Sequence, residues 1–248
     1  MFFTEAFDEF VEKIPREEMI CKNLSVKPDE KFYSEVVRYL GYKNNAKVTP
    51  EIDSLIQKGI AEVCITAEPR AMCRCFSVRN SSLLEGFDEM PSENFEKICN
   101  LPLHRYELII LMGATLGVTV DRLLKRTQVR NMTYALILDS CATAAIESVC
   151  DNLQDSLTAI YADRSMYITN RYSPGYGNLP LSFQTRLLFL LDAERKIGLN
   201  VTKDFLLTPT KSVTAIIGVS PFQQKNERIP CSACKMCNVC NFRRMEAL

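Results

Sequence analysis

The sequence predicts an α+β fold in which several amphipathic helices accompany a smaller number of short strands. Apolar residues recur at helical spacing over 28–40, and Gly41 stands just past the end of this pattern. Thr49 and Pro50 have the form of an N-cap and a first helical residue, so a second helix is expected after them. The β-branched, apolar run over 212–219 instead predicts a buried strand. With 248 residues, 47% of them hydrophobic, the chain can bury a sizeable core.

The remaining elements follow from the same two periodicities. Further helices are expected over 1–14, near 102–115 and 119–126, from Arg130 toward Leu157, and around 187–191. Further strands are expected over 70–78 and 165–171, with loops over 81–98 and 172–180. The middle of the long helix after Arg130 is rich in small residues, which predicts close packing of this helix on the sheet.

The charge balance and the single histidine narrow the class of function. Because 30 basic residues balance 30 acidic ones, the chain has no general attraction to nucleic acid or to an anionic membrane. No segment resembles a signal peptide, and the longest apolar runs, such as 108–112, are too short to span a bilayer, so a cytoplasmic protein is expected. One histidine, His104, rules out a site that needs two histidine ligands and weakens a catalytic-triad interpretation.

The 11 cysteines fall into two groups. Those before residue 151 are scattered, mostly among apolar residues, and are expected to act as small hydrophobes and not as disulfide partners. The others stand at intervals of three: Cys231, Cys234, Cys237 and Cys240. Four thiolates so close together can share one soft metal centre, and their spacing resembles the cysteine run of bacterial ferredoxins. A four-iron iron–sulfur cluster, a zinc ion, and an unliganded or oxidised tail all remain open.

One segment combines residues suited to a flat ligand that carries both charges: Arg171-Tyr172-Ser173-Pro174-Gly175-Tyr176-Gly177. An arginine can hold a carboxylate through two parallel hydrogen bonds, and tyrosine rings offer flat faces to a heterocycle or a cation. The Pro-Gly pair favours a tight turn, and the second glycine lets a ligand approach the main chain closely. By its chemistry alone the segment also fits a structural turn, which is a common use of Pro-Gly near arginine and tyrosine.

Arg171-x-x-Pro174-Gly175-Tyr176 resembles the S-adenosylmethionine motif of the activation domain of cobalamin-dependent methionine synthase, and the resemblance covers roughly residues 28–220. Other segments occur in the order seen in the short, stand-alone members of this family: Arg38-Tyr39-Leu40-Gly41-Tyr42, Thr115-Leu116-Gly117-Val118-x-Val120-Asp121, Asp139-x-x-Ala142-x-x-Ala145-x-Glu147, Ile197-Gly198-Leu199 and Leu207-Thr208-Pro209-Thr210-Lys211-Ser212-Val213. The resemblance implies a bent, mostly antiparallel sheet flanked by helices.

The resemblance also divides the chain and implies a ligand site. The three parts are an N-terminal helical extension (1–27), an activation-type S-adenosylmethionine-binding domain (28–220) and a cysteine-rich metal-binding tail (221–248). Arg171 would bind the ligand carboxylate, and Tyr176, the residue with an implied catalytic role, would lie near the sulfonium methyl and the corrin face. The other implied ligand contacts, from the turn, the long helix and the last strand, are Pro174, Gly175, Glu147, Ala215, Ile216 and Ile217.

The implied function is reactivation of a cobalamin-dependent methionine synthase in methionine biosynthesis. Cobalt that has been oxidised to cob(II)alamin is reduced by one electron and methylated by S-adenosylmethionine, and the domain positions these reactants. The homocysteine, folate and cobalamin domains are absent, so the chain is expected to act in trans on a cobalamin-binding synthase core or corrinoid protein, with flavodoxin or ferredoxin as reductant. Complete turnover by this chain alone is not expected. The alternative is a metal-tailed regulatory or interaction module for a corrinoid methyltransferase, without reactivation activity.

Overall fold

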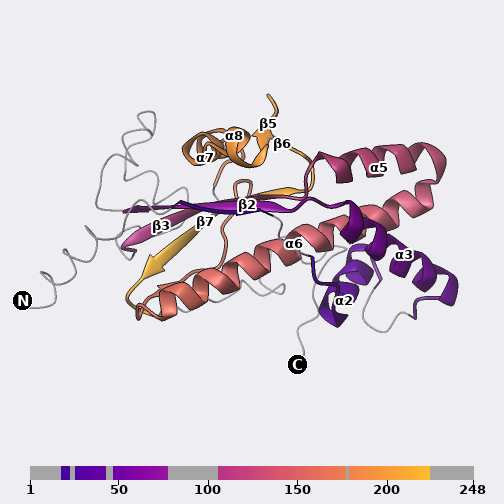
Figure 1. Cartoon of the computed structure of the whole chain (residues 1–248), viewed down its shortest axis with the longest axis horizontal. Coiled ribbons are helices and arrows are strands. Elements are labelled where there is room, and N and C mark those ends of the chain that lie inside the picture. Colours follow the sequence, from indigo (N-terminus) through magenta and orange to yellow (C-terminus); the bar gives the residue numbers. More distant parts are fainter. Residues whose placement is uncertain (1–17, 23–25, 43–46, 78–105, 177–178, 224–248) are drawn as a thin grey trace, which may run out of the picture.

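In the computed structural model, a five-stranded antiparallel sheet lies between two layers of helices (Figure 1). The structure describes residues 18–22, 26–42, 47–77, 106–176 and 179–223. The helices are α2 (Glu30–Tyr39), α3 (Pro50–Thr66), α5 (Val118–Arg130), α6 (Met132–Ala162), α7 (Phe183–Leu191) and α8 (Ala193–Ile197). The strands are β1 (Glu18–Lys22), β2 (Arg70–Ser77), β3 (Leu108–Thr115), β4 (Tyr167–Ile168), β5 (Asn200–Val201), β6 (Leu207–Thr208) and β7 (Ser212–Ser220). The predicted α+β class, with an antiparallel sheet flanked by helices, is confirmed.

Strand β3 forms the centre of the sheet, whose order is β1-β2-β3-β7-β4. It pairs with β7 over its whole length, from Leu108↔Val219 to Thr115↔Ser212. Every residue of β3 is buried, because helices cover both faces of the strand. The helix expected over 102–115 is therefore wrong for residues 108–115. When every residue of a run is apolar, the spacing of hydrophobic residues cannot distinguish a strand that is buried on both faces from a buried helix.

Strand β1 is a second departure from the expected elements. It pairs with β2 from Glu18↔Arg74 to Lys22↔Arg70, so the helical extension expected over 1–27 is wrong for residues 18–22. Five residues are too few to show a reliable period, and the hydrogen bonds that hold this strand come from a partner distant in sequence. The helix expected over 1–14 lies outside the described residues, and the division of the chain into three parts stays a prediction.

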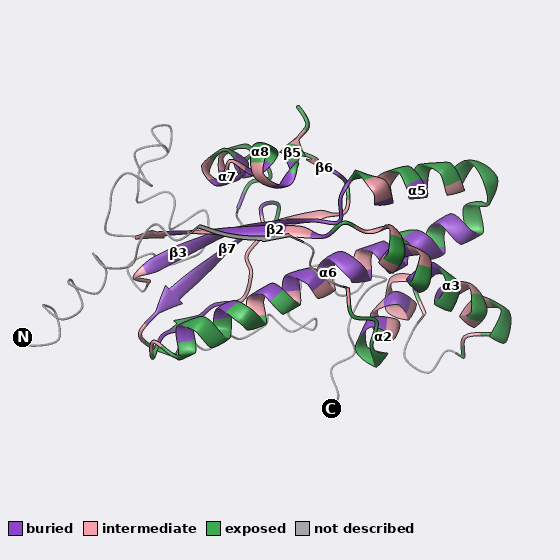
Figure 2. Cartoon of the chain, viewed as in Figure 1, coloured by how far each residue is buried: buried purple, intermediate pink, exposed green. Residues whose placement is uncertain are grey.

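Helix α6 packs along the sheet with its buried side facing inward (Figure 2). Cys141, Ala142 and Ala145 on this side are fully buried. Helix α3 approaches so closely here that a methyl group on Gly59 would lie 3.2 Å from the Cys141 sulfur. The small residues in the middle of α6 therefore admit a neighbouring helix as well as the sheet.

By length and composition alone, α6 could cross a membrane. In the fold, however, 67% of its most apolar window is buried inside the protein. That burial is typical of a core helix.

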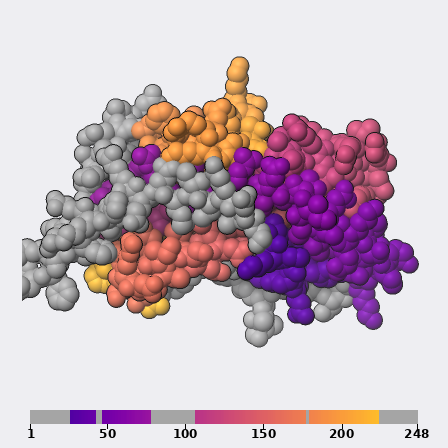
Figure 3. Space-filling model, viewed as in Figure 1, coloured from indigo at the N-terminus to yellow at the C-terminus, as the bar shows by residue number. Residues whose placement is uncertain are grey.

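Helices α7 and α8 lie on the side of the molecule opposite α6 (Figure 3). Their buried residues pack against the sheet in a second hydrophobic core. A buried polar pair connects this layer to the sheet, since the Thr214 hydroxyl of β7 donates to Gln184 Oε1 of α7 at 3.0 Å. Gln184 Nε2 in turn donates to the Phe205 carbonyl at 3.1 Å. These bonds satisfy a buried amide and fix α7 and the segment between β5 and β6 relative to β7.

Four of the scattered cysteines, Cys73, Cys75, Cys141 and Cys150, are buried in the core on the α6 side of the sheet. Burial raises the pKa of the Cys141 thiol to about 12. The thiol therefore stays protonated at neutral pH, and a protonated thiol is a poor nucleophile. The expected use of these cysteines as small hydrophobes is confirmed for these four.

Candidate ligand-binding site

The motif segment follows β4 and turns away at the edge of the sheet. Tyr172 bridges to Ile216 of β7 through two main-chain hydrogen bonds of 2.9 and 2.8 Å. The chain then turns through Pro174 and Gly175, where the Gly175 amide donates to the Leu179 carbonyl at 2.9 Å. Gly175 has a φ of 90°, a left-handed conformation that favours glycine. The expected Pro-Gly turn is therefore present, and it is anchored on β7.

Arg171 immediately precedes this bridge, and its side chain reaches α6. Nη2 of its guanidinium donates to Asp151 Oδ1 at 2.9 Å and to Glu147 Oε2 at 3.1 Å. Nη1 donates to Gln154 Oε1 at 3.2 Å. With 16% of the side chain exposed, the guanidinium is held in one place by charge-assisted hydrogen bonds.

The partners of Arg171 form one polar face of α6. Asp151 follows Glu147 by four residues and Gln154 follows Asp151 by three, which is the spacing of neighbours on one side of a helix. The second carboxylate oxygen of Asp151, Oδ2, accepts a hydrogen bond from Lys31 Nζ of α2 at 2.9 Å. Helices α2 and α6 and the motif segment therefore meet at Asp151.

The cluster keeps its charges while partly buried. Burial lowers the pKa of Arg171, but the neighbouring Cys150, Asp151 and Glu147 together raise it by more, so the pKa lies above its ordinary value. Burial raises the pKa of Asp151, but hydrogen bonds from Lys31 and Arg171 lower it by more, so this pKa lies below its ordinary value. Two cations and two acids balance in this cluster, which suits a ligand that itself carries charges of both signs.

A third basic residue, Lys211, contacts the polar face of α6 closer to the N-terminal end of the helix. Lys211 Nζ lies 2.8 Å from Asp139 Oδ1 and donates to Thr143 Oγ1 at 2.9 Å. Its side chain is 14% exposed, and it directly precedes β7. Arg171 and Lys211 therefore contact the same face of α6 at different positions along the helix axis, and both lie beside β7.

The three predicted contacts on β7 are fully buried. Both main-chain groups of Ile216 are bonded to Tyr172. Because alternate residues of an antiparallel strand bond to opposite neighbours, the main-chain groups of Ala215 and Ile217 face β3. A ligand that reached β7 through the main chain of Ile216 would have to take the place of the Tyr172 bridge.

The structure brings Arg171 and Glu147 together, whereas Tyr176 lies on the outer side of the turn with 71% of its surface exposed. Sequence reasoning missed Asp151, Gln154 and Lys31. The first two stand four and seven residues after Glu147, so helical spacing could have identified them. Nothing in the sequence points to Lys31, which is 120 residues from Asp151.

The predicted metal ligands Cys231, Cys234, Cys237 and Cys240 lie outside the described residues. In the part of the chain that the structure describes, no group of three or more histidine, cysteine, aspartate or glutamate side chains is placed to hold a metal ion. The iron–sulfur and zinc interpretations of the tail stay predictions.

Comparisons with known proteins agree with the family resemblance and the fold. Residues 112–226 match the family model of the vitamin B12 dependent methionine synthase activation domain. The fold is similar to a crystal structure of the MetH reactivation domain bound to AdoHcy, with a TM-score of 0.56 and 13% sequence identity over 85% of this chain and 81% of that one. No match was found among curated proteins. The resemblance drawn from the motifs is confirmed, and the matched segment contains both Arg171 and its partners on α6.

Proposed function

We propose that the chain binds S-adenosylmethionine and supports reductive methylation of a separate corrinoid protein, because residues 112–226 match the family model of the vitamin B12 dependent methionine synthase activation domain. The observation that carries the proposal is the guanidinium of Arg171, which is fixed beside Glu147 within the matched segment. Arg171, which the motif assigns to the ligand carboxylate, is thus next to Glu147, an acid that can bind the ligand ammonium.

The cluster fits an amino-acid group with a sulfonium nearby. The ligand carboxylate accepts hydrogen bonds from Arg171, and the ligand ammonium binds Glu147, whose side chain is 43% exposed. Gly175 lacks a side chain and has a φ of 90°, so the ligand can lie against the main chain of the turn that Pro174 opens. The AdoHcy bound to the similar MetH domain has the same amino-acid group, which supports this assignment.

Two further contacts belong to the proposal. Tyr176 lies near the sulfonium methyl, and its exposed ring is accessible to the corrin of a partner protein. The adenosyl part lies beside β7 around Ala215, Ile216 and Ile217, where it takes the place of the Tyr172 bridge to Ile216. The overall conversion joins cob(II)alamin, one electron and the methyl group of S-adenosylmethionine to give methylcobalamin and S-adenosylhomocysteine. The part of this chain is to hold and orient the methyl donor.

The proposal predicts reactivation in trans. Under anaerobic conditions, the full chain with S-adenosylmethionine and a reductant should convert cob(II)alamin on a cobalamin-binding methionine synthase core to methylcobalamin. The absorption spectrum of the corrinoid reports this conversion directly. Mixtures without S-adenosylmethionine or without reductant are the controls and should stay in the cob(II)alamin form. If the chain binds S-adenosylmethionine and the corrinoid protein yet no methylcobalamin forms, the regulatory-module alternative is favoured.

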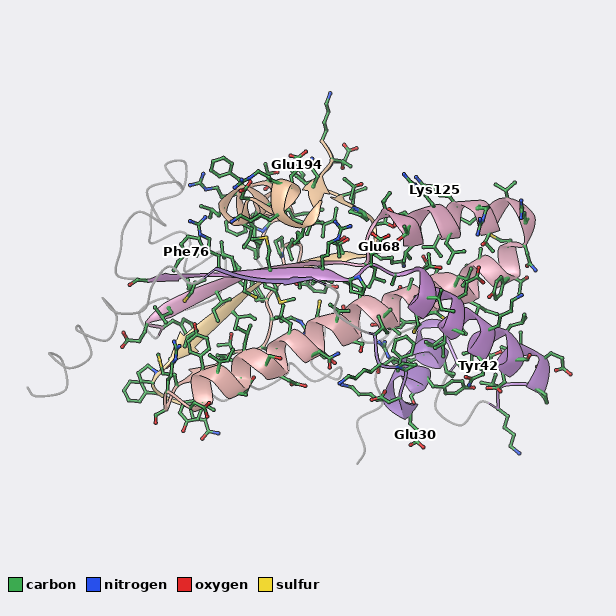
Figure 4. The ribbon with its side chains drawn as sticks, viewed as in Figure 1. Glu30, Tyr42, Glu68, Phe76, Lys125 and Glu194 are labelled. Atoms are coloured by element: carbon green, nitrogen blue, oxygen red, sulfur yellow. The ribbon has the colours of Figure 1, made fainter. Side chains whose placement is uncertain are left out.

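The electron donor in this proposal is an acidic protein such as a flavodoxin or a ferredoxin. The exposed residues of α5 include a basic set: Arg122, Lys125, Arg126 and Arg130. Figure 4 shows Lys125 pointing outward from α5. The acid on this helix, Asp121, accepts hydrogen bonds from the main chain and side chain of Thr210 at 2.9 and 2.6 Å. A basic face of this kind favours association with an acidic partner, especially at low ionic strength.

The cysteine tail is proposed to hold a four-iron cluster that relays the electron. Anaerobic preparations should then be brown, contain iron and acid-labile sulfide, and bleach on reduction. Changing Cys231, Cys234, Cys237 and Cys240 together to serine should abolish the cluster and impair reactivation while leaving S-adenosylmethionine binding unchanged. Stoichiometric zinc without iron, or full reactivation by the serine variant, would exclude the relay and leave the ligand site as proposed.

A further inference from the structure

Asp151 joins three segments of the chain through the two oxygens of one carboxylate. Oδ1 accepts from Arg171 of the motif segment at 2.9 Å, and Oδ2 accepts from Lys31 of α2 at 2.9 Å. Glu147 contacts the same nitrogen of Arg171 at 3.1 Å. In the described part of the chain, Arg171 is the cation paired with Glu147, whereas Asp151 is paired with two cations.

Glu147 and Asp151 therefore differ in how readily each can release Arg171 when a ligand carboxylate binds. Nη2 of Arg171 already donates to both of them, so a carboxylate that binds this nitrogen must displace one. Glu147 has the longer contact and the more exposed side chain, 43% against 38%. Asp151 has the shorter contact, and Lys31 binds its other oxygen at 2.9 Å, so the Asp151 carboxylate is held in its orientation toward Arg171. When Glu147 releases Arg171, the ligand ammonium takes the place of the guanidinium as its counter-ion.

We propose that Asp151 is a positioning residue that aims the guanidinium of Arg171 at the ligand carboxylate, with Lys31 of α2 holding Asp151 in place. Glu147 is the acid that releases Arg171 and turns to the ligand ammonium. This inference rests on the proposed function. It adds Lys31 of α2 to the candidate site, although Lys31 lies outside the segment that the family model matches.

Two ligands that differ only in the carboxylate separate these roles. S-adenosylmethionine and its decarboxylated form share the ammonium, the sulfonium and the adenosyl part. In calorimetric titration of the full chain, Asp151→Asn should bind S-adenosylmethionine about fivefold to tenfold more weakly than the parent. Its affinity for the decarboxylated ligand should change less than about twofold, because that ligand does not use Arg171. Glu147→Gln should weaken both ligands alike, because both carry the ammonium.

Lys31 provides a second, milder variant. Its side chain is 73% exposed, so Lys31→Met should fold, and it should weaken S-adenosylmethionine binding about twofold while sparing the decarboxylated ligand. Lys31→Arg keeps a donor to Asp151 and should restore parental affinity. Circular dichroism reports whether each variant is folded. If Asp151→Asn does not fold, the comparison of Lys31→Met with Lys31→Arg tests the positioning role instead.

The possible results separate this inference from the proposed function. An equal loss for both ligands in Asp151→Asn, or no loss for either, would overturn the positioning role. If Arg171→Ala weakens S-adenosylmethionine binding but Asp151→Asn and Lys31→Met do not, this inference fails and the proposed function stands. If the parent protein binds no S-adenosylmethionine, or Arg171→Ala binds it as well as the parent, the proposed function fails.

Discussion

Replacing Arg171 with alanine should weaken binding of S-adenosylmethionine about 30-fold, which corresponds to about 2 kcal/mol. The guanidinium is 16% exposed and already oriented by Asp151 and Gln154, so little freedom is lost when it meets the ligand carboxylate. A charge-assisted contact in such a setting is stronger than one at an open surface. Calorimetric titration of the anaerobically purified chain measures the change.

Two variants control for charge and for general damage. Arg195→Ala removes the same side chain from α8 on the other face of the sheet, where 78% of it is exposed, and should leave binding unchanged. Arg171→Lys keeps the charge but loses the planar fork, so its affinity should lie between those of the parent and Arg171→Ala. Parental affinity in a folded Arg171→Ala protein would show that the ligand does not bind here.

Replacing Leu138 with alanine should lower the free energy of unfolding by about 2–5 kcal/mol, because the substitution leaves a cavity in the core. Leu138 is fully buried on α6, and its Cδ2 atom would lie 3.7 Å from a methyl group on Gly59 of α3. It therefore packs at the contact between two helices of the same layer. Urea denaturation followed by circular dichroism measures the loss.

Leu136→Ala is the matched control for this experiment. It makes the same substitution two residues earlier on the same helix, at a side chain that is 59% exposed. The expected loss is below about 0.5 kcal/mol, as for surface substitutions generally. Similar losses in the two variants would contradict the placement of α6, because one face of the helix could then no longer be the buried one.

Short-range signals explain why several helices could be predicted. Thr49 caps α3 by accepting a hydrogen bond from the Ile52 amide at 3.5 Å, and Pro50 begins the helix, as the Thr-Pro pair indicates. Gly198, with a φ of 70°, ends α8. Such signals act within a few residues, so they can be read without a tertiary structure.

The same reasoning singled out part of the candidate site. The properties of arginine, proline and glycine drew attention to Arg171, Pro174 and Gly175, and the family resemblance assigned them to a ligand. Glu147 came from the family resemblance, and the structure places it 3.1 Å from Arg171. Asp151 and Gln154 needed the further knowledge of which face of α6 meets the motif segment.

What the sequence determines by itself is most of the helices, the α+β class and a set of residues whose chemistry suits a ligand with both charges. The tertiary structure alone decides that the apolar run over 108–115 is a central strand, because that depends on helices covering both of its faces. It also decides that β1 joins the sheet and that Lys31 reaches Asp151 across 120 residues. These features depend on hydrogen bonds and ion pairs between distant segments, and neither periodicity nor local propensity contains that information.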